Sequence, residues 1–366
     1  MQKYCFFLNF ASIVCIFQQK IVTLHTICIL GNMTNKEIYR EFCQNTPELP
    51  IFMHDWWLDA VCAGKQWDVL LCVESADGSH VLSVGEQDVQ RERIVAVLPY
   101  LIRKRAWMRY VLMPQMTQMG GIWLSECVRD DAQAGKQICA LFGEALQALR
   151  LSYYYQHYPL HSTAPQYMQE LGFKLKKRVT YRIEDLSDLD SVINSFSKNK
   201  KRQLQKALSL HVDYSLNIED FYRFHQDCLQ QQGKVIRYTR EFLLVLDRKT
   251  KRLNQSQILA IRNANEQLLA AAFLVWDKHN MYYLIPCYSP PHKDSGASAL
   301  LVLEAIKLAR KQGVAFDFEG SMIRGVAQHY KQFGSTPTTY YSVEKYYHWW
   351  FWFANAYNWF RERKMR

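Results

Sequence analysis

Residues 305–334 read AIKLARKQGVAFDFEGSMIRGVAQHYKQFG, and residues 145–172 read ALQALRLSYYYQHYPLHSTAPQYMQELG. Both stretches begin in an amphipathic helix, pass through a short aromatic strand and a second helix, and end on a glycine that can cap a helix. The two glycines, Gly172 and Gly334, lie 162 positions apart, which is the length of an ordinary domain. The repeat therefore predicts two similar domains in tandem.

The composition of the chain agrees with two globular domains. Its 366 residues are 49% hydrophobic and 22% charged, which excludes a disordered chain and is sufficient for two cores. The net charge of +11 favours anionic partners such as nucleic acid, a pyrophosphate-bearing ligand or acidic lipid. The ten cysteines show neither a CxxC pair nor a Cys/His spacing suited to zinc. We therefore expect reduced core thiols in a cytoplasmic protein, and no metal.

The periodicity of apolar residues predicts a mixed α/β fold in both domains. We expect a first domain over residues 33–184 and a second over 185–345, each with its own mixed sheet, and an aromatic and basic helix over 346–366. Residues 1–32 contain a short apolar run that resembles a signal-peptide core but has no convincing cleavage site, so we interpret them as an extension outside the fold. Thr34 or Asn35 is expected to cap the first helix. The second domain opens with a predicted long basic helix, Leu189 to Leu210.

The loop Pro291-His292-Lys293-Asp294-Ser295-Gly296-Ala297-Ser298 leaves a predicted strand and enters a helix. A helix N-terminus offers unpaired N–H groups and a partial positive charge, which suit a phosphate. Gly296 would let the backbone approach such a ligand, and Lys293 would add a positive charge. A plain Ser/Gly helix cap explains the same residues without a ligand, so this segment alone leaves both interpretations open.

The order strand, glycine loop, helix, strand, helix, strand resembles the GNAT acyltransferase fold, whose acyl-CoA pyrophosphate lies on a (Gln/Arg)-x-x-Gly-x-(Gly/Ala) loop. Lys293-x-x-Gly296-x-Ser298 is a degenerate form of that motif. The resemblance implies an acyl-CoA co-substrate held by Lys293, Ser295, Gly296, Ala297 and Ser298. The first domain has Cys127-Val128-Arg129-Asp130-Asp131 at the matching place, without glycine and with two acids, so we expect it to be degenerate.

Two further stretches resemble the FemAB-like branch of the GNAT proteins. They are Asp317-Phe318-Glu319-Gly320-Ser321 followed by Tyr330-Lys331-Gln332-Phe333-Gly334, and the helix Ser197 to Ala207 with its K-x-R-x-x-x-x-K-A pattern. The resemblance covers residues 50–345. That family includes enzymes that move an amino acid from aminoacyl-tRNA to a peptidoglycan precursor, and relatives described as acetyltransferases. The sequence shows no stretch for the long paired-helix arm of the tRNA-using members, so the resemblance favours the acetyltransferase branch.

Acylation of an amine needs a base for the ammonium proton and donors for the tetrahedral oxyanion. Asp317 and Glu319 share one face at the end of a predicted strand, where either could orient an amine or accept its proton. Tyr155 and His157 occupy the matching places in the first repeat, which favours a function for the two acids in the second. Tyr330 is a candidate general acid. The alternative for Asp317 and Glu319 is a capping role in a turn, and the alternative for Tyr330 is a role in packing alone.

Two basic segments indicate anionic partners. Lys198, Lys201 and Arg202 are candidates for binding a substrate or another anion, although a solvated charged helix face explains them equally well. Ten of the fifteen residues from Tyr346 to Phe360 are aromatic, and a basic end follows, which is typical of an interfacial membrane helix. Packing of these rings against the domains is the alternative.

Together these patterns predict an N-acyltransferase that moves an acyl group from acyl-CoA to an amine on a small-molecule, peptide or lipid-linked acceptor. The predicted location is the cytoplasm, with contact at the inner face of the membrane. One alternative is an aminoacyl-tRNA-dependent ligase that acts on a peptidoglycan precursor. The other is a non-catalytic adaptor associated with membrane or RNA.

Overall fold

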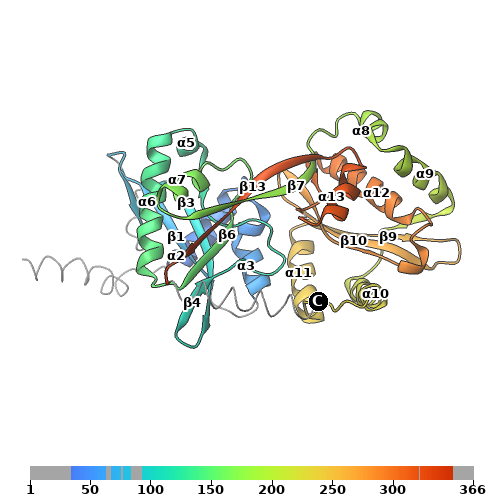
Figure 1. Cartoon of the computed structure of the whole chain (residues 1–366), viewed down its shortest axis with the longest axis horizontal. Coiled ribbons are helices and arrows are strands. Elements are labelled where there is room, and N and C mark those ends of the chain that lie inside the picture. Colours follow the sequence, from blue (N-terminus) through green and yellow to red (C-terminus); the bar gives the residue numbers. More distant parts are fainter. Residues whose placement is uncertain (1–33, 63–66, 76, 84–92, 321, 349–366) are drawn as a thin grey trace, which may run out of the picture.

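The computed structural model describes residues 34–62, 67–75, 77–83, 93–320 and 322–348, arranged as two lobes joined by long strands (Figure 1). The N-terminal half contains α2 (Asn35–Asn45), η2 (Ile51–Met53), α3 (Asp55–Cys62), β1 (Trp67–Glu74), β2 (His80–Leu82), β3 (Arg93–Arg105), β4 (Met108–Val111), β5 (Trp123–Leu124), α5 (Glu126–Arg129), α6 (Ala132–Ala148), β6 (Tyr153–His157), α7 (Ala164–Glu170) and β7 (Lys174–Ile183). The C-terminal half contains α8 (Leu189–Ser195), α9 (Lys198–Lys206), η3 (Ala207–Ser209), β8 (His211–Asp213), α10 (Ile218–Gln231), α11 (Arg240–Arg252), β9 (Ser256–Arg262), β10 (Leu268–Trp276), β11 (Asn280–Tyr288), η4 (Pro290–His292), α12 (Ala297–Gln312), β12 (Ala315–Asp317), α13 (Arg324–Lys331) and β13 (Thr336–Tyr346).

The described strands form one 13-stranded sheet in the order β2-β1-β3-β4-β6-β13-β7-β12-β11-β10-β9-β8, with β5 paired to β3. The last strand of each half lies in the other half: β13 pairs antiparallel with β6, and β7 pairs antiparallel with β12. The two exchanged strands also pair with each other along nearly their whole length. The predicted mixed α/β class is confirmed. The expectation of a separate sheet for each domain is wrong, because the exchanged strands join the two sheets.

The two halves repeat the same strand pattern around this exchange. In each half a parallel pair, β4 with β6 or β11 with β12, is followed by an antiparallel strand from the other half. This agreement supports the sequence repeat. The limits 33–184 and 185–345 remain a prediction.

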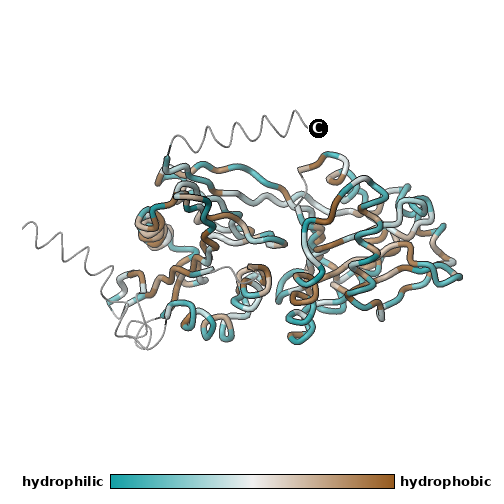
Figure 2. The backbone as a smooth tube through the Cα atoms, turned by 90° about the horizontal axis from the view of Figure 1, so that it is seen from below, coloured by the Kyte–Doolittle hydropathy of each residue, from teal (hydrophilic) through white to brown (hydrophobic). Residues whose placement is uncertain are grey.

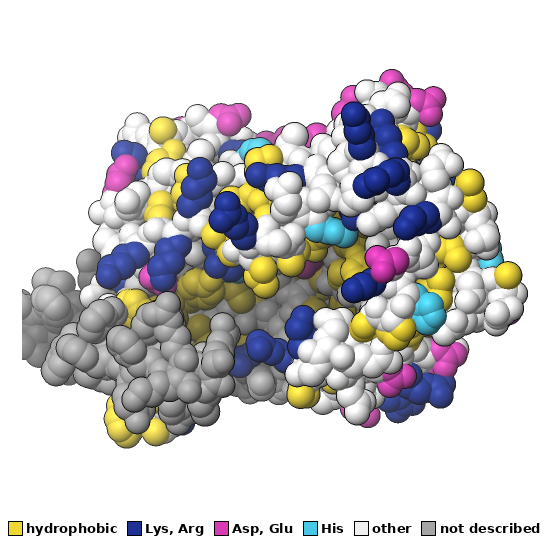
Figure 3. All heavy atoms as spheres, turned by 45° about the vertical axis from the view of Figure 1, so that its right-hand side comes forward, with side chains coloured by type: hydrophobic (Ala, Val, Ile, Leu, Met, Phe, Trp, Pro, Cys, Tyr) yellow, Lys and Arg dark blue, Asp and Glu magenta, His cyan; other side chains and the backbone are white. Residues whose placement is uncertain are grey.

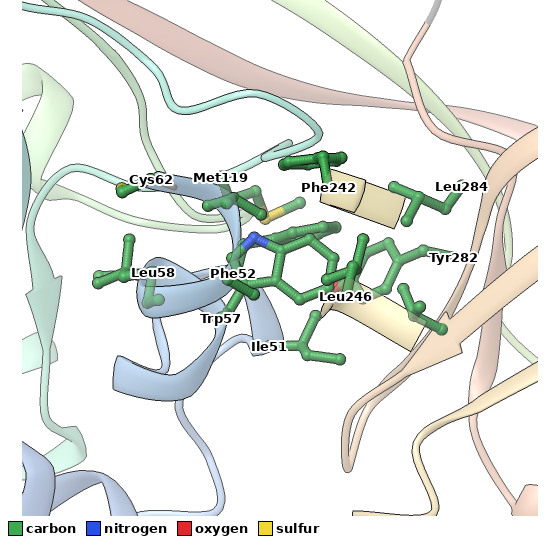
Figure 4. Close-up of a cluster of buried hydrophobic side chains, with 14 of the residues drawn as sticks. Ile51, Phe52, Trp57, Leu58, Cys62, Met119, Phe242, Leu246, Tyr282 and Leu284 are labelled. Atoms are coloured by element: carbon green, nitrogen blue, oxygen red, sulfur yellow. The ribbon is translucent and has the colours of Figure 1, made fainter. Parts of the chain in front are cut away.

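One hydrophobic core spans the two halves (Figure 4). Phe52 and Trp57, before and within α3, pack towards Phe242 and Leu246 of α11, and the rings of Phe52 and Tyr282 lie 4.6 Å apart. Two other cores lie mainly within one half each, under α6 and α12. Figure 2 shows these apolar segments gathered inside the lobes. The shared core fixes the two halves against each other, and it therefore fixes the site at their junction.

The start of the fold agrees with its sequence signals. Thr34 caps α2: its hydroxyl accepts from the N–H of Glu37, and the Glu37 carboxylate accepts from the N–H of Thr34. The predicted extension, residues 1–32, lies outside the described residues. Among the described residues, no helix combines the length and apolar character that a membrane span requires.

The predicted helix from Leu189 to Leu210 is wrong, because the chain breaks it into α8 and α9. Phe196 is extended, with ψ of 141°, and its ring packs edge-on against Phe333 at 5.3 Å. Ser197 then caps α9 by accepting from the N–H of Lys200. A buried aromatic contact and a serine cap therefore outweigh the helical propensity of this stretch.

The predicted C-terminal helix is wrong at its first residue, since β13 continues to Tyr346. Tyr346 pairs with Tyr153 of β6, and the next backbone N–H, of Tyr347, donates to the carbonyl of Ser152. The remainder of the predicted helix, from residue 349, lies outside the described residues.

Candidate active site

Asp317 ends β12 at the junction of the halves, and its side chain is fully buried. The hydroxyl of Thr180, on the exchanged strand β7, donates to Asp317 Oδ1 at 2.5 Å. Arg182, on the same strand, holds Nε 3.6 Å from Asp317 Oδ2, close enough for an ion pair. Burial raises the pKa of Asp317 to about 6, although the bond from Thr180 and the charge of Arg182 oppose the rise. The carboxyl group therefore titrates near neutral pH.

Glu319 follows in a backbone conformation that is rare for its residue type, with φ of 59°. Its Oε1 is inaccessible to solvent and has no hydrogen-bond partner among the described residues. Burial, followed by the charge of Asp317, raises the pKa of Glu319 well above its usual range. The next residue must be small, because a Cβ on Gly320 would lie 2.7 Å from the carbonyl oxygen of Val179. A carboxylate with one unpartnered oxygen, on a strained backbone and with a raised pKa, has the properties of a general base.

Tyr330, on α13, stacks on Phe318 between the two acids, with ring centroids 4.7 Å apart. Burial, followed by the charges of Glu319 and Asp317, raises the pKa of Tyr330, so the phenol stays protonated. The structure thus brings the three predicted catalytic residues together. Tyr330 also lines a cavity of about 500 Å³ between α10, β11 and α13. Its lining residues are His225, Cys228, Leu229, Gln232, Lys234, Pro286, Cys287, Tyr288, Gly325, Val326, His329 and Tyr330.

The predicted pyrophosphate loop does enter a helix, since Gly296 is the N-cap of α12 with φ of 84°. Its surroundings differ from those expected for an open anion site. A Cβ on Gly296 would lie 2.1 Å from the carbonyl oxygen of Gln203. The absence of a side chain at Gly296 therefore allows the backbone of α9 to pack against the loop. The Ser295 hydroxyl accepts from the N–H of Ala297 and donates to the carbonyl of His292. Lys293 is exposed and Ser298 is half-buried beside this contact.

The basic helix α9 divides into exposed and buried cations. Lys198 and Arg202 are exposed, and the ammonium of Lys201 donates to the carbonyl of Asn194 at 2.9 Å. Lys200, by contrast, is only 2% exposed, and burial lowers the pKa of its ammonium group to about 8. Its Nζ donates to Gln203 Oε1 at 3.1 Å and lies 3.3 Å from Nδ1 of His329. Lys200 therefore joins α9 to the helix that carries Tyr330.

Sequence reasoning missed several polar residues at this junction. Gln118 Nε2 donates to Thr180, which in turn donates to Asp317. His157 Nδ1 donates to the carbonyl of Gln118 at 2.9 Å, and its Nε2 accepts from the Tyr155 hydroxyl. The repeat had already aligned His157 with Glu319. No local signal distinguished Gln118 or Thr180, because they approach the acids from the other half.

Two other features of the described residues could bind ligands. Ligand atoms of Cys43, His54 and Asp55 lie within 4.8 Å of one another, but Nε of Arg40 is already 3.8 Å from Asp55 Oδ2. A second cavity, of about 580 Å³, lies at the junction of the halves, and Arg182, Glu184 and Lys278 are among its lining residues. Arg182 thus connects that cavity to Asp317.

Comparisons with known proteins concern the fold and one part of the chain. Residues 194–332 match the family model described as an acetyltransferase (GNAT) domain. The structure resembles the crystal structure of FemX, with a TM-score of 0.63 and 14% identity over 86% of this chain and 96% of that chain. Among curated proteins no match is found.

Two further solved structures give lower TM-scores. The C-terminal domain of a putative lysylphosphatidylglycerol synthetase from Agrobacterium fabrum gives a TM-score of 0.49 and 11% identity over 84% of this chain and 92% of that chain. A tandem GNAT protein from the clavulanic acid biosynthesis pathway gives a TM-score of 0.45 and 10% identity, over 79% of this chain and 93% of that chain. Residues 194–332 therefore match a GNAT acetyltransferase domain model, and the likeness to FemX shows the fold. The domain match supports an enzyme.

Proposed function

We propose that the chain transfers an acyl group from a phosphate-bearing donor to an amine, with Glu319 as the general base. The observation that carries this proposal is the solvent-inaccessible Oε1 of Glu319, which has no hydrogen-bond partner among the described residues. Glu319 as a whole is only half-buried, so an acceptor can reach this side chain, and an ammonium bound against it would give Oε1 its missing hydrogen bond and then its proton.

The reaction balances with the three residues in these roles. Glu319 takes one proton from the ammonium of the acceptor, and the freed amine attacks the acyl carbon to form a C–N bond. The bond from that carbon to the sulfur or oxygen of the donor breaks. Tyr330, protonated because its pKa is raised, supplies a proton to the leaving group and regains one from the attacking nitrogen, which loses its second proton as it becomes an amide. Asp317 orients the amine and, through its charge, keeps the pKa of Glu319 high.

Acyl-CoA is the first candidate donor. The GNAT match supports it, as does the loop from Lys293 to Ser298 at the start of α12. Lys198, Lys201 and Arg202 on the neighbouring helix would add positive charge for the phosphates. Figure 3 shows Lys and Arg side chains interspersed with hydrophobic ones on one face of the molecule, a combination that suits an anionic donor with an apolar arm.

Aminoacyl-tRNA is the second candidate donor, with a peptidoglycan precursor as the acceptor. One specific observation favours it: α9 covers Gly296, so the loop offers less room to a pyrophosphate than an open glycine loop does. The FemAB-like resemblance implies the same donor. The basic face of α9 would then contact RNA phosphates.

Titration calorimetry on the full chain separates the two donors. Saturable heat with CoA and acetyl-CoA, and none with a mixture of aminoacylated tRNAs, supports the first candidate; the opposite pattern supports the second. Lys293→Ala should weaken the binding of CoA and leave the binding of tRNA unchanged, because Lys293 belongs to the loop. Lys311→Ala, a change of an exposed lysine at the far end of α12, serves as its matched control. No heat from either donor, in a protein that remains folded, would contradict acyl transfer.

A further inference from the structure

The hairpin between β3 and β4 ends in a basic tip, residues 103–109, with the sequence RKRAWMR. In Figure 1 this hairpin projects from the lower edge of the N-terminal lobe. Trp107 is 79% exposed, although it is among the largest side chains of the molecule. An exposed tryptophan at the end of a projecting hairpin is an unusual use of apolar surface in a soluble fold.

The positive charges of the tip repel one another and destabilise the hairpin. Lys104 and Arg109 lie directly opposite each other in the strand register, where like charges destabilise the pair. Arg103 and Arg105 add two more cations. None of these four is paired with an acid among the described residues. An anionic partner would relieve this repulsion.

The order of residues along the hairpin distinguishes between anionic partners. The apolar residues Ala106, Trp107 and Met108 form the end, and the cations lie behind them. At about 3.3 Å per residue, Arg105, Lys104 and Arg103 lie roughly 3–10 Å behind the tip. That depth matches the headgroup layer around an apolar group inserted into a bilayer surface. Proteins that bind single-stranded nucleic acid instead interleave aromatic and basic residues along a groove.

We propose that the basic tip inserts Trp107 into the surface of an anionic membrane, with Arg103, Lys104, Arg105 and Arg109 against the lipid headgroups. This contact would hold the chain at the bilayer reversibly, because one aromatic ring and four cations give a weak anchor. The proposal does not depend on which donor the active site uses.

Co-sedimentation of the full chain with vesicles tests the proposal. Vesicles of phosphatidylcholine with phosphatidylglycerol should bind the chain, and vesicles of phosphatidylcholine alone should not. Trp107→Ala should lower the partition coefficient about tenfold, since it removes the large apolar side chain that the membrane would bury. Arg105→Ser should lower it about fivefold, and added salt should weaken the binding of the unchanged protein.

Two control variants carry matched changes away from the tip. Val235→Ser removes an apolar side chain that is 82% exposed, and Arg248→Ser removes an exposed cation of α11. Neither should change vesicle binding. Equal losses in the controls and the tip variants, or tight binding to an unstructured RNA that Trp107→Ala abolishes while vesicle binding persists, would overturn the proposal. Unchanged circular dichroism of all four variants checks that they fold.

Discussion

The hydroxyl of Thr180 donates to Asp317 Oδ1 at 2.5 Å across the junction of the two halves. Thr180 belongs to the last strand of the N-terminal half, and Asp317 ends the central strand of the C-terminal repeat. Strand exchange is what brings them together, because β7 lies beside β12 only after it crosses into the other half. The candidate active site is therefore built from both repeats.

Thr180→Val should destabilise the protein by about 1.5–3 kcal/mol at neutral pH, because it removes a buried hydrogen bond to a charged acceptor. The bond favours ionised Asp317, whose pKa is about 6, so the loss should be largest above pH 6 and smaller below it. Urea denaturation on either side of pH 6 measures this difference.

Thr250→Val is the matched control. The Thr250 hydroxyl is equally buried but donates only to backbone carbonyls, so its loss should cost about 1 kcal/mol at every pH. The same pH dependence in both variants would contradict a special link between Thr180 and Asp317.

Glu319→Gln should lower kcat about 100- to 10,000-fold and leave donor affinity unchanged, because the amide cannot accept the ammonium proton. Steady-state kinetics with the donor that the calorimetry identifies, together with its dissociation constant, check both parts. Glu344→Gln is the control: Glu344 is a buried glutamate that accepts from Tyr153 and pairs with Lys176. An equal loss of rate in both variants would point to a general effect of removing buried charge.

The pH profile of kcat/KM should rise with pH, since Glu319 must be ionised to act as a base. Its acid limb should lie well above the usual pKa of a glutamate, because burial and Asp317 both raise the pKa of Glu319. Asp317→Asn removes the neighbouring negative charge, so the acid limb should move to lower pH, and a reduced activity should persist because Asp317 also orients the amine. Complete loss of activity in Asp317→Asn would instead make Asp317 the base.

The sequence predicted the mixed α/β class and the helix that follows Gly296, because both depend on local patterns of apolar residues and on a glycine cap. Asp317, Glu319 and Tyr330 were predicted as a group because the second repeat places all three on neighbouring elements.

The parts of the site that sequence reasoning missed depend on contacts between distant segments. Gln118 and Thr180 reach Asp317 only through the exchanged strand, and no local pattern specifies an exchange. Gly296 fits both a phosphate loop and close helix packing, and nothing in the sequence indicated that the backbone of Gln203 lies against it. Lys200 lies in the same basic run as Lys198 and Lys201, and only its contact with His329 of α13 distinguishes it from them.

Gly296→Ala should destabilise the protein more than the same substitution at a glycine that has a positive φ but open space around it. The new Cβ would meet the backbone oxygen of Gln203 at 2.1 Å, so α9 or α12 must move. Gly313→Ala is the matched control, since Gly313 has φ of 70° and open space around it. We expect about 1–2 kcal/mol for the control and about 1–3 kcal/mol more for Gly296→Ala, measured by urea denaturation. Equal values would mean that the contact between α9 and the loop is loose.

Phe52→Ala should destabilise the whole molecule by about 3–5 kcal/mol, because it opens a cavity in the core that both halves share. The Phe52 ring contacts Trp57 in its own half and Tyr282 in the other, so both sides lose packing. Unfolding in urea should remain a single transition, since the exchanged strands and this core couple the two lobes. Hydrogen exchange should show equal loss of protection in α6 and α11, although neither helix contains the substitution. A loss of protection confined to the N-terminal half, or two separate transitions, would show that the halves unfold independently despite sharing a sheet.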